Sequence, residues 1–532
     1  MKPHFTTHRP LVMGTNWMVT ADHPLAAQTG ASVLEAGGNA VDAAVAANLV
    51  MTCVRPHMCG FGGDLFALIY MAQGSRLEAL NASGRAPALA SIDSYRQKGL
   101  EEIPETGILA GTVPGAIAGW QAALEKHGTM GLDRLLAGVI AYAENGFPMY
   151  EELAQVIAER RPVLSPAAVD IFLPGGRVPQ VGDIVRQPRL AASCRKLAEE
   201  GPDAFYKGEL GHALLKLSRD QGGLFGEQDL INNACDWVAP LCTAYRGCEI
   251  CTQPPNSQGI ALLMQANILE HGDLSAMVPD QADLVHLMVE AKKLAFADRD
   301  RYVCDPDFHP VPVAAMLDKA LARDQAARID PRHAARSAQP RDFTRGGSDT
   351  IYLAVVDQSG NAVSLIQSLF EPFGSGVMVP ETGMLLHNRG RGFSLDPQHP
   401  NRLEPGKRPY HTLHPVMILK DGKPFFVLGT PGADGQTQSI MQLCVDLLDF
   451  GANVQEAVEA PRWRSEPDGA LLIEGRFPEK TLDDLRARGH HLKVLDDYDG
   501  VMGSSQAIAI DSDRGIVAGG ADPRRQAYAI GK

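Results

Sequence analysis

Thr350 is the residue whose type and setting most directly indicate chemistry. It follows the polar run 345–349 and opens the apolar run 350–356, which is typical of a buried strand. If the peptide bond between Asp349 and Thr350 is cut, Thr350 gains a free α-amine next to its hydroxyl. Such an amine has a pKa of roughly 7.7–8.0 and can accept the hydroxyl proton, which an amide nitrogen cannot do. The sequence therefore suggests an amide hydrolase that activates itself by cleavage.

The segments on either side of Thr350 are compatible with such a cut. Residues 326–349 are rich in Ala, Arg, Asp, Pro and Gly and lack an apolar period, which predicts a flexible, exposed linker. The runs 350–356 and 362–366 are strand-like, with a turn at 357–361 between them. A linker between two domains would explain the segment equally well, but it does not explain the threonine.

The elements that must position this region are both helical and strand-like. Asn39 is predicted to cap a helix over residues 40–49, whose small side chains allow close packing. The glycine-rich stretch 59–64 has no Gly-Lys-Ser/Thr ending and precedes the apolar run 65–70. Tight backbone packing therefore explains it better than phosphate binding does. Residues 116–235 are predicted to be mostly helical.

Charge and composition narrow the choice of partners. The chain has 532 residues, 45% of them hydrophobic, and a formal net charge of −14. Such a composition predicts a globular protein with a sizeable core. The acidic balance argues against nucleic acid and against an anionic membrane, because both need basic patches.

The cysteines and the N-terminus bear on location. Of nine cysteines, Cys248 and Cys251 form a C-x-x-C pair close to Cys242. No second such pair lies nearby, so buried or surface thiols explain them better than zinc does. The first ten residues lack the apolar segment of a signal peptide, and no stretch approaches a membrane span. These features predict a cytoplasmic protein with reduced cysteines, and nothing in the sequence calls for a metal or an organic cofactor.

A series of short motifs runs in order along nearly the whole chain. They are residues 37–44 (GGNAVDAA), 111–115 (GTVPG), 254–259 (PPNSQG), 297–299 (ADR), 304–308 (CDPDF), 374–376 (GSG), 407–409 (KRP) and 429–432 (GTPG). Each is weak by itself, but their order and spacing together are specific. With them the chain resembles the γ-glutamyltransferases of the Ntn (N-terminal nucleophile) hydrolase superfamily.

This resemblance implies an α+β fold, the four-layer αββα sandwich of the Ntn hydrolases, made as an inactive precursor. The precursor would cut itself between Asp349 and Thr350. The large subunit would comprise residues 1–349 and the small subunit residues 350–532, with Thr350 as its catalytic N-terminus. Both would remain together in one structural domain. The oligomeric state stays open, a dimer of heterodimers being one candidate.

The resemblance also implies roles for three further residues. It places the backbone amides of Gly432 and Ala433 at the oxyanion that forms during acyl transfer, where one donor is typically worth about 100- to 1,000-fold in rate. A turn between a strand at 425–428 and a helix beginning near Gln436 would account for the same loop. Ser368 stands where the family has a second threonine near the nucleophile.

The substrate-binding positions depart from the γ-glutamyl pattern. Ser83 stands at the position of the family's substrate-binding arginine, with Arg85 two residues later. Gly392 falls on the acidic position that holds the substrate amine, and Phe370 on an asparagine position. The pair His411-Thr412 replaces two serines. A buried ammonium without a carboxylate partner would be strongly disfavoured, so the pocket is predicted to take a substrate that lacks the amine.

The groups that remain favour a carboxylate. Arg85, Arg389, Arg391 and His411, with Thr412 beside them, are predicted to bind the carboxylate of a small amide. The pattern resembles the amidohydrolase branch of the family, which includes oxamate amidohydrolase and cephalosporin or glutaryl acylases. The leading hypothesis is therefore hydrolysis of oxamate to oxalate and ammonia, as in purine or allantoin nitrogen catabolism. The alternatives are γ-glutamyl hydrolysis or transfer on glutathione-type substrates, a glutaryl or cephalosporin acylase, and an uncleaved relative that only binds a metabolite.

Overall fold

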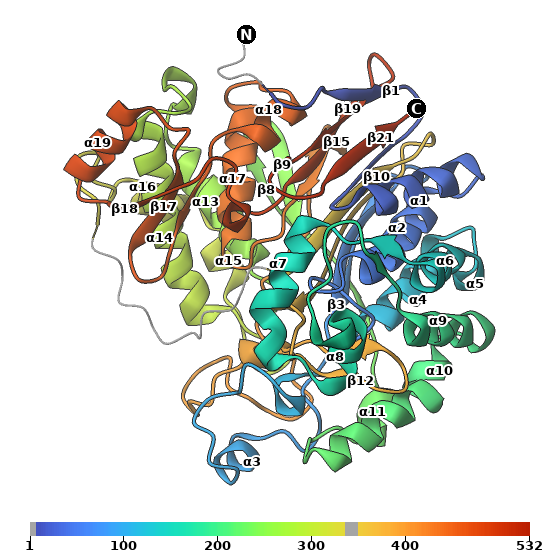
Figure 1. Ribbon diagram of the computed structural model, residues 1–532. Helices are drawn as coiled ribbons and strands as arrows, with labels where there is room; N and C mark the ends of the chain where they lie inside the picture. The colour runs from blue at the N-terminus through green and yellow to red at the C-terminus, as the bar shows by residue number, and fades with distance from the viewer. Residues whose placement is uncertain (1–6, 336–348) are drawn as a thin grey trace.

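Two antiparallel sheets of seven strands each face one another at the centre of the molecule (Figure 1). The computed structural model describes residues 7–335 and 349–532; of Asp349 it describes only the backbone. In spatial order, sheet I contains β21 (Tyr528–Gly531), β2 (Met18–Ala21), β10 (Asp349–Val356), β11 (Ala362–Phe370), β3 (Asp64–Met71), β4 (Arg76–Ala82) and β7 (Asp236–Val238). Sheet II contains β1 (Val12–Gly14), β20 (Ile516–Ala521), β19 (Gln506–Asp511), β15 (Lys423–Gly429), β14 (Val416–Lys420), β9 (Cys248–Thr252) and β8 (Leu241–Tyr245).

Strands from before and after residue 349 are interleaved in both sheets. In sheet I, β10 pairs with β2 on one side, and β11 pairs with β3. In sheet II, β14 pairs with β9. The two parts of the chain therefore share one continuous framework.

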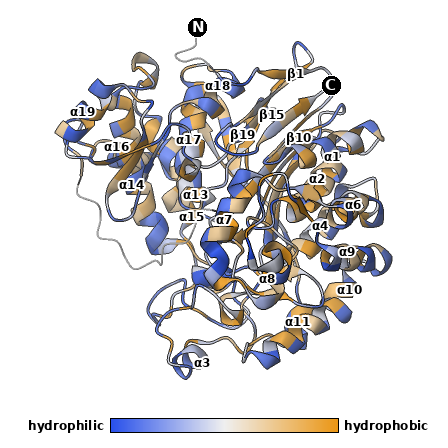
Figure 2. Ribbon diagram, viewed as in Figure 1, coloured by the Kyte–Doolittle hydropathy of each residue, from blue (hydrophilic) through white to orange (hydrophobic). Residues whose placement is uncertain are grey.

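An apolar layer fills the space between the sheets. It includes Phe66 and Ile366 of sheet I and Met417 and Val427 of sheet II, all fully buried. Figure 2 shows mostly apolar colouring on the strands, whereas outer helices such as α19 (Glu479–Ala487) carry much polar colouring. Burial of this layer by both sheets is the main reason that they stay face to face.

Helices cover the outer face of sheet I. Helices α1 (Pro24–Glu35), α2 (Ala40–Val54) and α4 (Ala116–His127) pack directly on it. The buried side chains of eight further helices join the same apolar cluster: α5 (Leu132–Leu135), α6 (Ala137–Asn145), α7 (Glu151–Arg160), α8 (Pro166–Phe172), α9 (Pro188–Glu200), α10 (Asp203–Tyr206), α11 (Glu209–Asp220) and α12 (Glu227–Ile231). The short elements α3 (Ile92–Arg96), β5 (Phe147–Pro148), β6 (Ile184–Val185), β12 (Met378–Val379) and β13 (Met384–Leu385) complete this half.

The predicted cap of α2 is confirmed. Asn39 Oδ1 accepts hydrogen bonds from the amides of Val41 and Asp42 at 2.9 and 3.1 Å, and Asp42 Oδ2 accepts one from the Asn39 amide at 2.8 Å. This reciprocal capping box starts the helix, and every residue of α2 is buried. The alanine-rich sequence is thus used for close contact with sheet I.

A second set of helices covers sheet II. It comprises α13 (Gly259–Leu269), α14 (Ala282–Tyr302), α15 (Val313–Met316), α16 (Lys319–Ala326), α17 (Gly435–Leu448), α18 (Val454–Glu459) and α19. A small sheet of β16 (Trp463–Ser465), β17 (Ala470–Glu474) and β18 (His491–Leu495) lies on this side. With helices outside both sheets, the predicted α+β, αββα sandwich is confirmed (Figure 1).

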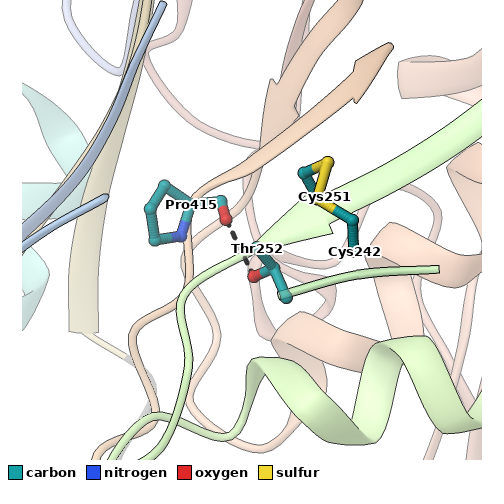
Figure 3. The surroundings of a disulfide bond; sticks show 4 residues. All are labelled: Cys242, Cys251, Thr252 and Pro415. Carbon is teal, nitrogen blue, oxygen red and sulfur yellow. Dashed lines mark hydrogen bonds between the residues drawn. A yellow bond between two sulfur atoms is a disulfide. The ribbon is translucent and has the colours of Figure 1, made fainter. Parts of the chain in front are cut away.

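The expectation that all the cysteines are reduced is wrong for one pair. Cys242 of β8 and Cys251 of β9 stand directly opposite each other, with Cα atoms 4.1 Å apart, and form a disulfide (Figure 3). The next residue, Thr252, donates a hydrogen bond from Oγ1 to the Pro415 carbonyl at 2.9 Å. The register of β8 and β9 brings Cys242 and Cys251 together. The C-x-x-C spacing of Cys248 and Cys251 does not predict this pairing. The other seven cysteines are free.

The predicted linker begins at the end of α16. Residues 327–335 form turns and coil and are mostly exposed, which agrees with the prediction for this part. Residues 336–348 lie outside the described residues. Among the helices of the described ranges, none is long and apolar enough to cross a membrane.

Candidate active site

Thr350 lies at the beginning of a central strand of sheet I, and only 2% of it is exposed. Asp349 pairs with Phe370 and Ile351 pairs with Gln367, so the register shifts between them. Thr350 therefore faces Ser368 and Leu369 across this irregularity. The predicted nucleophile and the predicted second hydroxyl residue are neighbours on adjacent strands.

The glycine-rich loop at 59–64 contacts β11 on the side opposite to β10. A Cβ atom on Gly63 would lie 2.5 Å from the Ser368 carbonyl oxygen, so only glycine fits without displacing backbone. Asp64, the next residue, pairs with Ser368 at the start of β3. The loop thus uses its glycines for close packing and delivers a carboxylate beside the candidate site.

Ser368 is tied to its surroundings by two further contacts. Its Oγ accepts a hydrogen bond from the Phe370 amide at 2.6 Å and one from Arg389 Nη2 at 3.2 Å. Phe370 has a φ of 80°, a left-handed conformation that is uncommon for a bulky residue. The Phe370 ring lies 4.1 Å from the Arg389 guanidinium. The strained end of β11 therefore places an aromatic face against a cation.

Arg389 lies deep in the molecule at the start of the 3-10 helix η5 (Arg389–Gly392) and is fully buried. Besides Ser368, its Nη1 donates to Thr412 Oγ1 at 3.2 Å. The nearest carboxylate oxygen, on Asp64, is 3.9 Å from its Nε, and that Nε has no hydrogen-bond partner in the described chain. Burial lowers the pKa of this guanidinium to about 10, so it keeps its charge at neutral pH.

Asp64 organises the polar groups behind Arg389. Its Oδ1 accepts from the Gly84 amide at 2.9 Å, and its Oδ2 lies 3.1 Å from His411 Nε2 and 3.4 Å from His387 Nδ1. Burial by itself would raise the pKa of this carboxyl, but the two histidines outweigh it and hold the pKa well below its usual range. Asp64 is thus a buried anion that is already satisfied.

His411 is neutral in this arrangement. Its Nδ1 accepts a hydrogen bond from the Leu413 amide at 3.2 Å, so its proton is on Nε2, facing Asp64. Burial lowers its pKa to about 3, and the nearby charge of Arg389 acts in the same direction. His411 therefore positions Asp64 and supplies no cation for a substrate carboxylate.

The predicted oxyanion loop connects β15 to α17. Gly432 has a φ of 133° and Ala433 a φ of 47°, both in the left-handed region. Across the described ranges, neither the Gly432 nor the Ala433 amide donates a hydrogen bond to another residue. Two buried, neighbouring N–H groups without a partner are what a developing oxyanion requires.

Gln258 braces this loop. Its Nε2 donates to the Thr412 carbonyl at 2.7 Å and to the Ala433 carbonyl at 2.9 Å. Its Oε1 accepts from Arg299 Nη1 at 2.9 Å and from the Tyr410 hydroxyl at 3.0 Å. One buried side chain thus fixes the segment that carries Thr412 relative to the loop that carries Ala433.

Arg391 is only two residues beyond Arg389, but it is held by a carboxylate. Arg391 Nη1 forms a short ion pair with Glu371 Oε1, and Asn388 Nδ2 donates to Glu371 Oε2 at 3.1 Å. The substrate role predicted for Arg391 stays a prediction.

Arg85 is surrounded by acidic groups. Its guanidinium lies 3.5–3.8 Å from carboxylate oxygens of Asp307, Asp305 and Asp236, and it donates to the Gly406 carbonyl at 3.1 Å. A third of its side chain is exposed. The contacts bring Ser368, Arg389, Thr412 and His411 together, but they do not connect Arg85 to that group. Its substrate role stays a prediction too.

Three residues of this network were not predicted from the sequence: Asp64, His387 and Gln258. Gln258 lies within the motif at 254–259, and Asp64 ends the glycine-rich loop. The position of Asp64, directly before the apolar run 65–70, was the available indication. His387 offered none, since its contact with Asp64 depends on the tertiary fold.

A buried threonine at the start of a central strand, a neighbouring hydroxyl and two unpaired backbone amides, all within a two-sheet sandwich, define an Ntn hydrolase. The Gamma-glutamyltranspeptidase family profile matches residues 26–532. The chain therefore belongs to the γ-glutamyltranspeptidase family and is a hydrolase that acts on amide bonds.

Individual relatives match this chain over nearly its whole length. The chain is 40% identical over 528 residues to the glutathione hydrolase-like YwrD proenzyme of Bacillus subtilis (strain 168), covering 98% of this chain and 99% of the relative. It is 37% identical over 533 residues to the oxamate amidohydrolase proenzyme of Klebsiella pneumoniae subsp. pneumoniae, with coverage of 98% and 99%. The crystal structure of cephalosporin acylase from Bacillus halodurans superposes with a TM-score of 0.93 at 36% identity, covering 99% of this chain and 98% of that one.

Proposed function

We propose that the chain cuts itself between Asp349 and Thr350 and then hydrolyses a small amide that carries a carboxylate and no α-amine, with oxamate as the first candidate. Arg389 is the observation that carries the substrate proposal. It is a buried cation beside Ser368 and Thr412, and its nearest carboxylate stands 3.9 Å away. A substrate carboxylate would accept the hydrogen bonds that Asp64, at this distance, does not take from the guanidinium.

Cleavage creates the catalytic base. The Thr350 hydroxyl attacks the Asp349 carbonyl, the peptide C–N bond breaks to leave an ester, and water hydrolyses that ester. The interleaved strands of both sheets support continued association of residues 1–349 with residues 350–532 as one structural domain. The proenzyme names of two relatives agree with such processing.

Substrate hydrolysis follows the same pattern. The Thr350 amine takes the proton of its own hydroxyl, whose oxygen attacks the amide carbon. The Gly432 and Ala433 amides bind the oxyanion, and its collapse expels ammonia, which takes the proton from the amine. Water then cleaves the ester, so one oxamate and one water give oxalate and ammonia.

Other acids of this kind remain alternatives. A glutaryl amide also has a carboxylate and no α-amine, and a structural neighbour is a cephalosporin acylase. The γ-glutamyl alternative needs an anion for the substrate ammonium. Asp64 is satisfied by two histidines and Glu371 is paired with Arg391, so neither is available for an ammonium.

A denaturing gel tests the self-cleavage. Freshly purified protein is expected to show two chains, the smaller beginning at Thr350 by Edman sequencing. Thr350→Ala should give one chain without activity. A wild-type sample that stays uncut and has no Thr350 N-terminus would refute the proposal.

A substrate panel tests the specificity separately. Ammonia release should be compared for oxamate, malonamate, succinamate and glutaramate, with a chromogenic γ-glutamyl anilide as the matched amine-bearing substrate. Higher kcat/KM for the acids than for the anilide is expected, and the best chain length identifies the substrate class. Turnover of the anilide that is faster by orders of magnitude would refute the carboxylate proposal while leaving self-cleavage intact.

A further inference from the structure

A second cluster of ionisable side chains lies among the helices outside sheet II. His286 and Glu290 lie one turn apart on α14, and His490 lies between α19 and β18, directly before the strand. All three are buried, and one ligand atom from each lies within 4.8 Å of the other two. Two imidazoles and a carboxylate converging in this way form a common ligand set for zinc-type ions.

The hydrogen bonds orient the two rings for a shared ligand. His286 Nε2 lies 2.7 Å from the Asp330 carbonyl oxygen, which can only accept, so the proton is on Nε2 and Nδ1 carries a lone pair. Nδ1 in turn lies 2.8 Å from His490 Nε2. Metal-bound histidines typically have a carbonyl holding the other ring nitrogen, as Asp330 does here.

The carboxylate of the cluster also suits a metal. Glu290 accepts from Lys293 Nζ at 2.7 Å and from the Ala335 amide at 3.2 Å. A carboxylate has about four acceptor sites, which leaves capacity for an ion.

The cluster joins the two sides of the chain. His286 and Glu290 come before residue 349, and His490 comes after it. Part of the predicted linker contacts the cluster: the Asp330 carbonyl and the Ala335 amide bond to it directly, and the Ala334 amide donates to the Arg488 carbonyl at 2.8 Å.

We propose that His286, His490 and Glu290 bind a divalent transition-metal ion of the zinc class, with water as the fourth ligand, and that this ion links α14 to the C-terminal part of the chain. His490 then carries its proton on Nδ1, and the metal replaces the hydrogen bond between the rings. The rings must separate slightly, and the proton of His490 only moves from Nε2 to Nδ1, so none is released.

Metal binding to the purified, tag-free full chain tests this site. After dialysis against a chelator, the protein is titrated with Co²⁺ alone, and then with Zn²⁺. One Co²⁺ per chain with visible absorption bands of tetrahedral coordination is expected, and Zn²⁺ should displace it. Zn²⁺ should raise the melting temperature by a few degrees, because the ion binds the folded state.

Variants locate the ion. Glu290→Gln and His490→Asn should each weaken Co²⁺ binding at least tenfold and abolish the thermal shift. His491→Asn changes the adjacent, exposed histidine and should leave both unchanged. If His490→Asn fails to fold, Glu290→Gln still decides, since it removes only charge. Wild-type protein that binds no Co²⁺ at submillimolar concentration, or binding that survives in Glu290→Gln, overturns the proposal.

Discussion

Arg389 and Arg391 belong to the same short helix, η5, but their surroundings differ in one respect. Arg391 forms an ion pair with Glu371, whereas Arg389, within the described residues, donates to two hydroxyls and lies 3.9 Å from Asp64, its nearest carboxylate. Arg85 resembles Arg391, because acidic groups already surround it. We therefore propose that the carboxylates already around each arginine decide which of the three binds the carboxylate of the substrate.

Of the substitutions that compare Arg389 with Arg391, replacing Arg389 should have the largest effect on activity. Arg389→Gln removes the cation but keeps a donor, so kcat/KM for a carboxylate-bearing amide should fall about 10- to 100-fold, the usual worth of a charged hydrogen bond. Self-cleavage should persist. For a neutral amide of similar size, used as the comparison substrate, kcat/KM should change little. Steady-state kinetics on both substrates measures this. An equal loss on the neutral amide would make Arg389 structural.

Replacing Arg391 should instead cost stability. Arg391→Gln leaves Glu371 buried without its partner, which typically costs about 3 kcal/mol in the free energy of unfolding. Chemical denaturation measures the loss, and kcat/KM of the folded variant should stay within a few-fold of wild type. Adding Glu371→Gln should restore much of the stability. If Arg391→Gln is stable but raises KM strongly, Arg391 binds substrate.

Acid sensitivity should report on His411. Its pKa of about 3 lies below that of an unfolded histidine, so the unfolded chain takes up the proton first as pH falls. The contribution of His411 to the free energy of unfolding is therefore fully present above about pH 6.5. As the pH falls from about 6.5 to about 5, the free energy of unfolding should decrease by about 2 kcal/mol because of this residue. Denaturation curves of wild type and His411→Gln at both pH values should show a smaller pH slope in the variant. Equal slopes would mean that His411 is not buried in neutral form.

Replacing Arg85 should have the smallest effect. Its ion pairs are long and partly exposed, and such pairs contribute at most about 1 kcal/mol. Arg85→Ala is expected to change KM less than about threefold while leaving cleavage intact. A KM increase as large as that of Arg389→Gln would reinstate Arg85 as the residue that holds the carboxylate.

Local patterns predicted much of the framework. The Asn39 cap, the strand at 350–356 and the close packing of the glycine-rich loop were readable because neighbouring residues determine them. The disulfide of Cys242 with Cys251 was not, because it depends on which residues stand opposite in two strands.

The resemblance indicated part of the candidate site. Gly432 and Ala433 lie in the loop between β15 and α17, and Ser368 lies on β11. Their roles stay predictions. The contacts of Asp64 with His387 and His411 join residues more than 300 positions apart in sequence, and only the assembled sheets bring them together. How closely a carboxylate approaches each arginine is a property of that assembly as well.

The interleaving of strands in both sheets has a consequence for the lifetime of the enzyme. Before the cut, unfolding yields one chain that can refold by itself. After the cut, it yields two chains, and recovery must begin with their encounter, so it slows with dilution and competes with aggregation. The mature protein would then seldom refold after it unfolds. Its lifetime would be determined by how slowly it unfolds.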